Sequence, residues 1–317
     1  MIKSELLKKL SVITEEEKSI LSGNQMVDRS IYVSGKNVID AKKLLSQGKL
    51  ITARPHTRFI RFPEHTHNYV EAIYMCSGKT MHIINGEELV LNEGELLFLS
   101  RNAKQEIMPA GENDIAVNFI ILPEFFSTVM QMLDEEETPL KKFIIDSMKQ
   151  EDSVSGYLHF KVADIIPIQN LIENLIWNLV FDTANKRKIN ATTMGLLFML
   201  LINNTDRLAS NNDEDDAIIK VLRYIEDNYV NASLYELARL LHYDFAWLSR
   251  EIKRRTGDNY TTLIQKKRIS QACFLLKNTN MNIEDIALNV GYSNISYFHR
   301  LFKQFQGVTP REYRICK

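Results

Sequence analysis

The sequence predicts a multidomain α+β protein, in which a small N-terminal β-barrel with flanking helices precedes an all-α C-terminal domain. Three observations support this fold class. Residues 51–122 contain short apolar runs cut by glycines, residues 123–208 change to a helical period, and residues 217–317 contain a helical repeat. At 317 residues the chain is longer than one ordinary hydrophobic core requires, so we expect at least two domains.

The N-terminal part is expected to begin with helices and to continue as strands. Residues 1–50 form a helical extension, in which Thr14 and Glu17 have the spacing of a capping box. Within 51–122, runs such as EAIYMCSG and ELLFLS have the length of strands. Asn85-Gly86 predicts a hairpin turn, because both residues tolerate positive φ. Short strands at this spacing favour a small antiparallel barrel or sandwich.

Residues 123–208 have apolar side chains at helical spacing, as in IIPIQNLIENLIWNLVFDT and TMGLLFMLLINN. The second of these runs is apolar around most of its circumference, so we expect it to pack against another helix or a second subunit. Residues 209–216 are polar and acidic and predict a linker. We therefore expect 123–208 to be a helical dimerisation region and 217–317 to be a separate helical domain.

The net charge of −1 conceals a strong asymmetry. Residues 217–317 hold 16 Lys and Arg against 9 Asp and Glu, whereas residues 1–216 hold 23 against 31. A basic C-terminal domain predicts a polyanionic partner. Three widely spaced cysteines, a charged N-terminus and the lack of any long apolar run predict a reduced, cytoplasmic protein without a secretion signal or membrane span.

The C-terminal domain contains an internal repeat. Residues 238–243 match 287–292 at an offset of 49, and Arg250, Lys253 and Gly257 recur at an offset of 50. In each copy a capped short helix leads through a turn to a second helix that ends at a glycine. The predicted caps of the short helices are Ser233 and Asn282, and those of the second helices are Asp244 and Ser293.

Two short helices joined by a tight turn predict a helix-turn-helix, whose second helix enters the DNA major groove. The exposed faces of the two second helices are basic. The long helix expected between the copies, over 259–278, has a length of about 30 Å, close to one turn of DNA. A plain helical bundle with basic faces is the alternative, but two matched copies favour DNA binding. The basic residues are Arg250, Lys253 and Arg254 in the first copy and His299, Arg300 and Lys303 in the second.

The stretch IEDIALNVGYSNISYFHRLFKQFQGVTPREYR resembles the DNA-binding domain of the AraC/XylS family of bacterial transcription regulators. The resemblance covers about 225–315 and implies two helix-turn-helix units bridged by a long helix. It also implies which side chains face the bases, while Lys253 and Lys303 are expected to meet phosphates. The base-facing positions would be Ala246, Ser249 and Arg250 in the first unit and Ile295, Ser296, His299 and Arg300 in the second.

The N-terminal module resembles a cupin, a small β-barrel found in many sensors of this family. The residues His65, His67, Glu71 and Gly78 fit the first cupin motif, HxHx3Ex6G. On a strand, the first three side chains would share one face. In the second motif, however, Gln105 occupies the position of the last histidine, so we expect no metal and no cofactor.

The barrel is nevertheless expected to hold a small-molecule effector, with carbohydrate as one candidate class. The polar and aromatic residues expected to face that ligand are His65, His67, Glu71, His82 and Tyr74. The leading hypothesis is therefore a homodimeric regulator that binds double-stranded promoter DNA, contacts RNA polymerase, responds to this effector and has no enzymatic activity. Two alternatives are a metal-dependent cupin enzyme with a DNA-binding tail, and a ligand-free regulator whose barrel is only a dimerisation scaffold.

Overall fold

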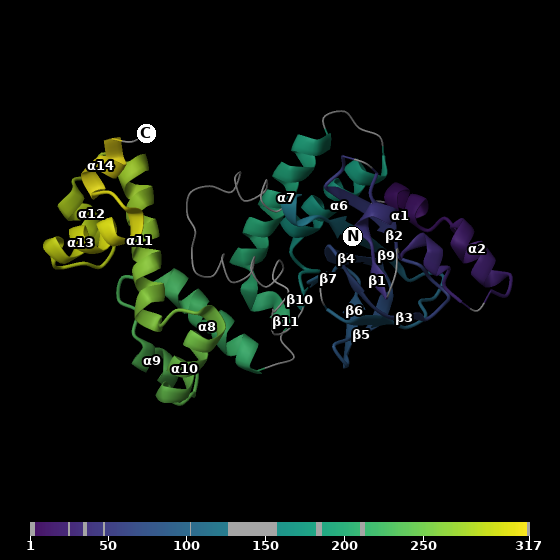
Figure 1. Cartoon of the computed structure of the whole chain (residues 1–317), viewed down its shortest axis with the longest axis horizontal. Coiled ribbons are helices and arrows are strands. Elements are labelled where there is room, and N and C mark those ends of the chain that lie inside the picture. The colour runs from purple at the N-terminus through teal and green to yellow at the C-terminus, as the bar shows by residue number, and fades with distance from the viewer. Residues whose placement is uncertain are drawn as a thin grey trace. The chain divides into compact units, whose positions relative to one another are not determined.

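The computed structural model describes residues 4–24, 26–33, 37–46, 48–101, 103–125, 157–181, 186–209 and 213–315, with the backbone alone at 213–216. These residues divide into two compact units, one ending at residue 209 and the other beginning at 213 (Figure 1). Each unit is described by itself. No helix within the described ranges is long and apolar enough to cross a membrane.

The N-terminal unit contains two β-sheets. The first has five strands in the order β1 (Val38–Ile39), β3 (Phe62–His67), β8 (Gln105–Ile107), β5 (Lys79–Ile84) and β6 (Glu87–Asn92). The second has six, in the order β11 (Leu208–Ala209), β10 (Tyr157–Phe160), β7 (Leu96–Leu99), β4 (Val70–Ser77), β9 (Ile115–Ile121) and β2 (Ile51–Pro55). This β-rich architecture confirms the fold class predicted for the N-terminal domain.

The hairpin predicted at Asn85-Gly86 joins β5 to β6, and both residues have positive φ. A second tight turn explains the glycine of the HxHx3Ex6G motif. Gly78 has a φ of 75°, and a Cβ there would lie 2.2 Å from Asp114 Oδ1, which accepts a hydrogen bond from the Lys79 amide. The motif glycine is therefore required by a turn and not by a ligand.

Helices accompany the sheets in this unit: α1 (Ser4–Leu10), α2 (Glu15–Leu21), η1 (Arg29–Ile31), α3 (Ala41–Leu44), α6 (Ile166–Val180), α7 (Lys186–Asn203) and η2 (Thr205–Arg207). The capping box predicted at Thr14 and Glu17 is present at the start of α2. The helices α6 and α7 pack against one another. The part of the predicted helical region at 126–156 lies outside the described residues.

Two segments differ from the sequence prediction. Residues expected to be helical form β10, a strand in which all four side chains are buried. A short apolar run of this kind has no periodicity that separates a buried strand from a buried helix. The helix α8 (Asp213–Asn228) begins inside the segment 209–216 that was predicted as a linker.

The C-terminal unit is entirely helical in the described residues. After α8 it contains α9 (Leu234–Leu240), α10 (Phe245–Thr256), α11 (Tyr260–Asn278), α12 (Ile283–Asn289), α13 (Ile295–Gln306) and α14 (Pro310–Ile315). The pairs α9–α10 and α12–α13 are the two predicted helix-turn-helix units, and α11 is the long helix between them (Figure 1). An apolar core around Phe298 and Phe302 joins the second pair to α11.

Candidate functional site

The second helix of the first unit, α10, separates its residues into a buried and an exposed face. Leu248, Glu251 and Ile252 are buried. Ala246 and Arg250, one turn apart, are exposed, and Lys253 continues that face. Ser249 and Trp247 are half-buried, and Arg254 is partly exposed. The Arg254 guanidinium donates hydrogen bonds to both carboxylate oxygens of Glu251, at 2.8 and 2.5 Å.

The equivalent helix of the second unit, α13, has the same division with larger core residues. Phe298, Leu301 and Phe302 are buried on one face. Ser296, Arg300 and Lys303 are exposed, while Ile295 and His299 are half-buried at the edges of that face. The Arg300 guanidinium lies over the Tyr297 ring, with the carbon 5.4 Å from the ring centroid. Each unit thus presents a stripe of cationic side chains opposite its core.

Capping residues fix where the four helices begin. Ser233 and Asn282 cap α9 and α12 by accepting hydrogen bonds from the amides of Glu236 and Asp285, as predicted. Asp244 caps α10 through the Trp247 amide. The prediction of Ser293 as the cap of α13 is wrong, because Asn294 accepts the hydrogen bond from the Tyr297 amide. The second turn is one residue longer than the first, which also explains why the repeat offset changes from 49 to 50.

A half-buried arginine on α11 attaches the second unit to the rest of its domain. Arg268 donates hydrogen bonds to the carbonyl oxygens of Tyr229, Val230 and Gly291, all at 2.8–2.9 Å. Its guanidinium carbon lies 5.1 Å from the centroid of the Tyr292 ring. Arg268 therefore joins the end of α8 and the turn between α12 and α13, and it positions the second helix-turn-helix on the long helix.

The barrel of the N-terminal unit encloses a cluster of polar side chains from both sheets. His65 and His67 on β3, His82 on β5 and Gln105 on β8 come from one sheet. Glu71 on β4 comes from the other, and each of these side chains is buried. The rings of His65 and His67 contact each other with centroids 4.9 Å apart. A cavity of about 30 Å³, lined in part by His65 and Glu71, remains beside this polar cluster.

Hydrogen bonds link part of the polar cluster. Asn118 on β9 accepts from His56 Nδ1 at 3.0 Å and donates to Glu71 Oε1 at 3.0 Å. Gln105 donates to His82 Nδ1, so the neutral His82 ring carries its proton on Nε2 and donates it to Thr80 Oγ1. Other polar atoms in the polar cluster lack hydrogen-bond partners, although buried polar groups are normally paired. They are both ring nitrogens of His67, Glu71 Oε2 and Gln105 Oε1.

Burial disfavours the charged forms of these groups. Desolvation lowers the pKa of His56 and of His65 to about 4, and it lowers the pKa of His67 and His82 well below the usual range. Desolvation also raises the pKa of Glu71 to about 7, although its hydrogen bond from Asn118 acts in the opposite direction. The polar cluster is therefore suited to a ligand that is bound by hydrogen bonds between neutral groups.

Comparison with known protein families assigns both units. Residues 48–201 match the AraC-like ligand binding domain, and residues 237–315 match a helix-turn-helix domain. The chain belongs to the AraC/XylS family of transcription regulators. As a member of this family it has an N-terminal ligand-binding domain and a C-terminal helix-turn-helix DNA-binding domain.

The chain is similar to several transcription regulators. The chain is 26% identical to the HTH-type transcriptional activator RhaS of Mannheimia succiniciproducens, over 80% of this chain and 90% of that protein. It is 24% identical to RhaR of the same organism, over 80% of this chain and 87% of that protein. Among solved structures, the C-terminal domain of AraT, a response regulator from Geobacillus stearothermophilus, is 32% identical over 32% of this chain and 85% of that one, with a TM-score of 0.31.

The barrel of this AraC-family protein does not fit the metal that the cupin motif implies. Gln105 supplies an amide where the second motif requires a histidine, and that amide donates its hydrogen bond to His82 Nδ1. His67 Nε2 and Glu71 Oε2 lie 3.5 Å apart and are only two potential ligands. Within the described residues, no group of three or more His, Cys, Asp or Glu side chains has the geometry of a metal site.

Four of the five residues predicted to face an effector lie in the polar cluster, and the fifth lies elsewhere. Tyr74 is on the opposite face of β4 from Glu71, and its hydroxyl donates to Gln169 Oε1 on α6. Sequence reasoning missed His56 and Asn118, which complete the polar cluster, because neither belongs to the cupin motif. It also missed Arg268, whose position in the basic run QKKR indicates a charged helix surface and gives no sign of its carbonyl contacts.

Proposed function

We propose that the exposed stripes of α10 and α13 bind promoter DNA, with Arg250 and Arg300 reading bases and Lys253 and Lys303 contacting phosphates. The observation that carries this proposal is the duplication: two capped helices present arginine and lysine at the same two positions. Arginine can donate two parallel hydrogen bonds to guanine, whereas lysine near the helix end acts as a point charge. The 19-residue helix α11 is about 29 Å long, which suits two neighbouring major grooves.

Salt titration of the full-length protein on a selected DNA site tests this proposal. Six or so phosphate contacts per chain would make log affinity fall linearly with log salt concentration, with a slope of about −5 to −6. The variant Lys253→Ala/Lys303→Ala should reduce the magnitude of that slope by about two. As a control, Lys277→Ala, on α11 away from both stripes, should leave the slope unchanged. A slope near zero for the unaltered protein would contradict the proposal.

For the N-terminal domain we propose that the polar cluster binds a small, uncharged, hydroxyl-rich effector, for which carbohydrate is the leading class. Four unpaired atoms of His67, Glu71 and Gln105 support this, because they offer donors and acceptors that a polyol can satisfy. Tyr32 and Leu44 line the small cavity between the N-terminal segment and the barrel. Binding would require this segment to move, since 30 Å³ is about the volume of one water molecule.

Thermal unfolding of the full-length protein against a panel of neutral sugars tests the effector site. A bound sugar should raise the midpoint of unfolding in proportion to its concentration relative to Kd. The double variant His65→Ala/His67→Ala should lose that shift while DNA binding at fixed salt is retained. Glu88→Ala, at an exposed position of β6, is the control and should retain both. A sugar-induced shift that survives the double variant would exclude the polar cluster as the site.

We also propose that the protein is a homodimer formed through α7. Leu196 and Met199 are 48% and 46% exposed, and Ile189 lies two turns earlier on the same face. Leu196→Glu should produce a monomer in sedimentation experiments, whereas Asn170→Glu, exposed on α6, should not. If both variants remain dimeric, the interface lies elsewhere.

We propose that the protein activates transcription by contacting RNA polymerase, because the similar proteins RhaS and RhaR are named transcriptional activators. Reporter transcription from a promoter carrying the selected site should rise when the full-length protein is expressed. A fall in transcription would identify a repressor and leave the DNA-binding proposal intact.

A further inference from the structure

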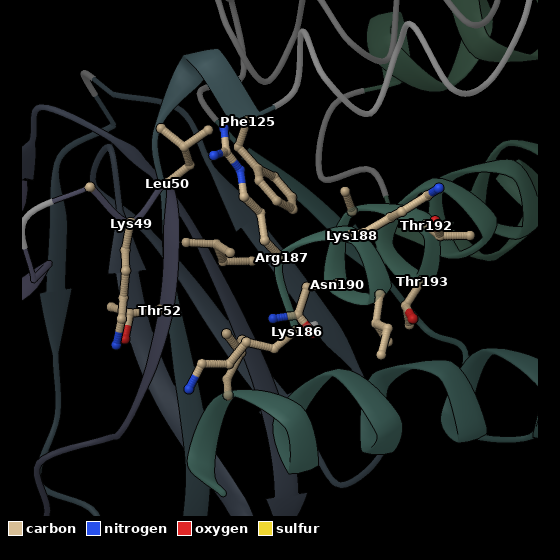
Figure 2. A pocket seen from close by; sticks show the side chains of 15 residues that line it. Lys49, Leu50, Thr52, Phe125, Lys186, Arg187, Lys188, Asn190, Thr192 and Thr193 are labelled. Carbon is tan, nitrogen blue, oxygen red and sulfur yellow. The ribbon is translucent and has the colours of Figure 1, made fainter. Parts of the chain in front are cut away.

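A second and much larger cavity lies between β2 and the start of α7. Its volume is about 1270 Å³, and it shares no lining residue with the cavity beside the polar cluster. One wall is formed by residues 48–52, which lead into β2, and the other by residues 186–193 of α7 (Figure 2). Phe125 and Leu179 complete the lining. This space can hold a drug-sized ligand.

All the charged side chains in the described lining of this cavity are cationic. The described lining contains Lys49, Lys186, Arg187 and Lys188 and no acidic residue. Three of these cations occupy the first turn of α7, which has no acidic residue. Cations are unfavourable there, because the helix dipole already makes that end positive. An anion bound beside Arg187 would offset the charge of that guanidinium and the dipole.

A buried amide at the same place lacks a partner. Asn190 is only 2% exposed and lines the cavity, yet its Oδ1 accepts no hydrogen bond. Figure 2 shows Asn190 between the start of α7 and the β2 wall, with Arg187 extending beside Leu50 and Phe125. Lys188 extends in a different direction, away from these side chains. An unpaired buried acceptor requires a donor that the cavity lining itself does not provide.

We propose that this cavity is a second ligand site, which binds an apolar molecule carrying a carboxylate and, next to it, a hydroxyl or amide N–H. The carboxylate would be held by the Arg187 guanidinium, since a guanidinium pairs with a planar carboxylate through two parallel hydrogen bonds. The neighbouring donor would bond to Asn190 Oδ1. The apolar body would pack against Leu50, Phe125 and Leu179. This site is independent of the sugar site proposed for the polar cluster.

Calorimetric titration of the full-length protein with three matched probes tests the inference: 3-hydroxyoctanoate, octanoate and 1-octanol. We expect 3-hydroxyoctanoate to bind most tightly, octanoate less tightly and octanol at least about tenfold more weakly than octanoate, because charge-assisted hydrogen bonds are lost. Arg187→Ala should weaken both acids at least about tenfold. Lys188→Ala removes the same charge from the same turn and should change neither affinity by more than about twofold.

Asn190→Ala separates the two polar contacts. It should remove the preference for 3-hydroxyoctanoate over octanoate and leave octanoate binding unchanged, which also shows that the variant is folded. Equal binding of octanol and octanoate, equal effects of Arg187→Ala and Lys188→Ala, or a hydroxyl preference that survives Asn190→Ala would each overturn the inference. Inorganic phosphate that binds as tightly as octanoate would overturn it too, because the apolar body would then contribute nothing.

Discussion

The two helix-turn-helix units have the same order of caps, helices and glycine stops, but they differ in how firmly the turn is held. In the second unit the turn contains Gly291, whose carbonyl accepts from Arg268, and Tyr292, which is buried under the same guanidinium. In the first unit the equivalent residues are His242, exposed with a φ of 58°, and Tyr243, which stacks on Trp247. The turn of a helix-turn-helix can therefore be held by a neighbouring helix, as in the second unit, or by its own side chains, as in the first.

The recognition helices differ in a related way. In the first unit Glu251 occupies a core position and holds the guanidinium of Arg254. Fifty residues later the corresponding positions are Leu301 and Gln304, and the core is built from phenylalanines. The second unit is thus stabilised mainly by apolar packing and by Arg268, whereas in the first Arg254 and Arg255 both form internal ion pairs with Glu251.

The largest effect is expected at the turn of the second unit. A Cβ at Gly291 would lie 2.8 Å from the Val230 carbonyl oxygen and 3.0 Å from Arg268 Cζ, at a φ of 91°. Gly291→Ala should therefore destabilise the second unit by about 2–4 kcal/mol, through both strain and steric overlap. Gly307→Ala, also at positive φ but with open space around it, should cost only about 1–2 kcal/mol. Hydrogen exchange of α12 and α13 amides measures both, and equal losses would contradict the difference in packing.

Removal of the arginine that holds this turn should be nearly as costly. Arg268→Ala leaves the carbonyls of Tyr229, Val230 and Gly291 without their donor, so we expect a loss of about 2–3 kcal/mol in the same exchange measurement. The effect should be confined to the second unit and to the end of α8. Arg223→Ala, which removes a more exposed ion pair with Asp227, should cost less than about 0.5 kcal/mol. Equal destabilisation of α9 and α10 would show that the two units are not held independently.

Substitutions in the recognition helices should have effects of intermediate size on DNA affinity, and they separate base reading from phosphate contact. Arg300→Ala should cost about 1–3 kcal/mol on the selected site and relax the preference at one base pair. Lys303→Ala should weaken binding to all sequences similarly and reduce the salt slope by about one. Arg250→Ala should act like Arg300→Ala, but at the neighbouring groove. Binding-site selection with each variant measures the preference, and unchanged selection in both arginine variants would contradict their base-reading role.

The smallest effect is expected for Arg254. Because its guanidinium is held by Glu251, Arg254→Ala should weaken DNA binding by less than about 0.5 kcal/mol, below the loss for Arg250→Ala. The comparison is made on one site at one salt concentration. If Arg254→Ala costs as much as Arg250→Ala, the ion pair with Glu251 opens in the complex and the first unit uses one more cation than its free structure suggests.

Local patterns predicted the elements that have short-range causes. The Asn85-Gly86 hairpin, the capping boxes and the glycine stops of α10 and α13 depend on residues within four positions of one another, so the sequence contains their full explanation. The cap at Asn294 was missed because the second turn has an extra residue that a constant offset does not reveal. The strand at Tyr157–Phe160 was missed because its partner, β7, is about sixty residues away in the chain.

The residues of the candidate sites also divide into those whose position follows from the local sequence and those whose position depends on distant segments. The exposed stripes of the recognition helices could be predicted because helical spacing alone assigns their faces. The residues His56, Asn118, Arg268 and Asn190 could not, since each acquires its role from a segment distant in sequence. Tyr74 illustrates the converse: its strand was predicted, but the face it occupies depends on the register of β4, which places it toward α6.

The neutral histidines of the barrel couple unfolding of the N-terminal unit to proton uptake. An unfolded chain protonates His56 and His65 near pH 6.5, whereas the folded unit does so only near pH 4. Between these values the unfolded state binds more protons, so acidification removes up to about 1.4 kcal/mol per pH unit for each of the two. Glu71 acts oppositely, because its folded pKa of about 7 makes the native state take up a proton first. Acidification below about pH 6.5 is therefore expected to destabilise the ligand-binding unit through its buried histidines, and the Glu71 carboxyl offsets part of that loss.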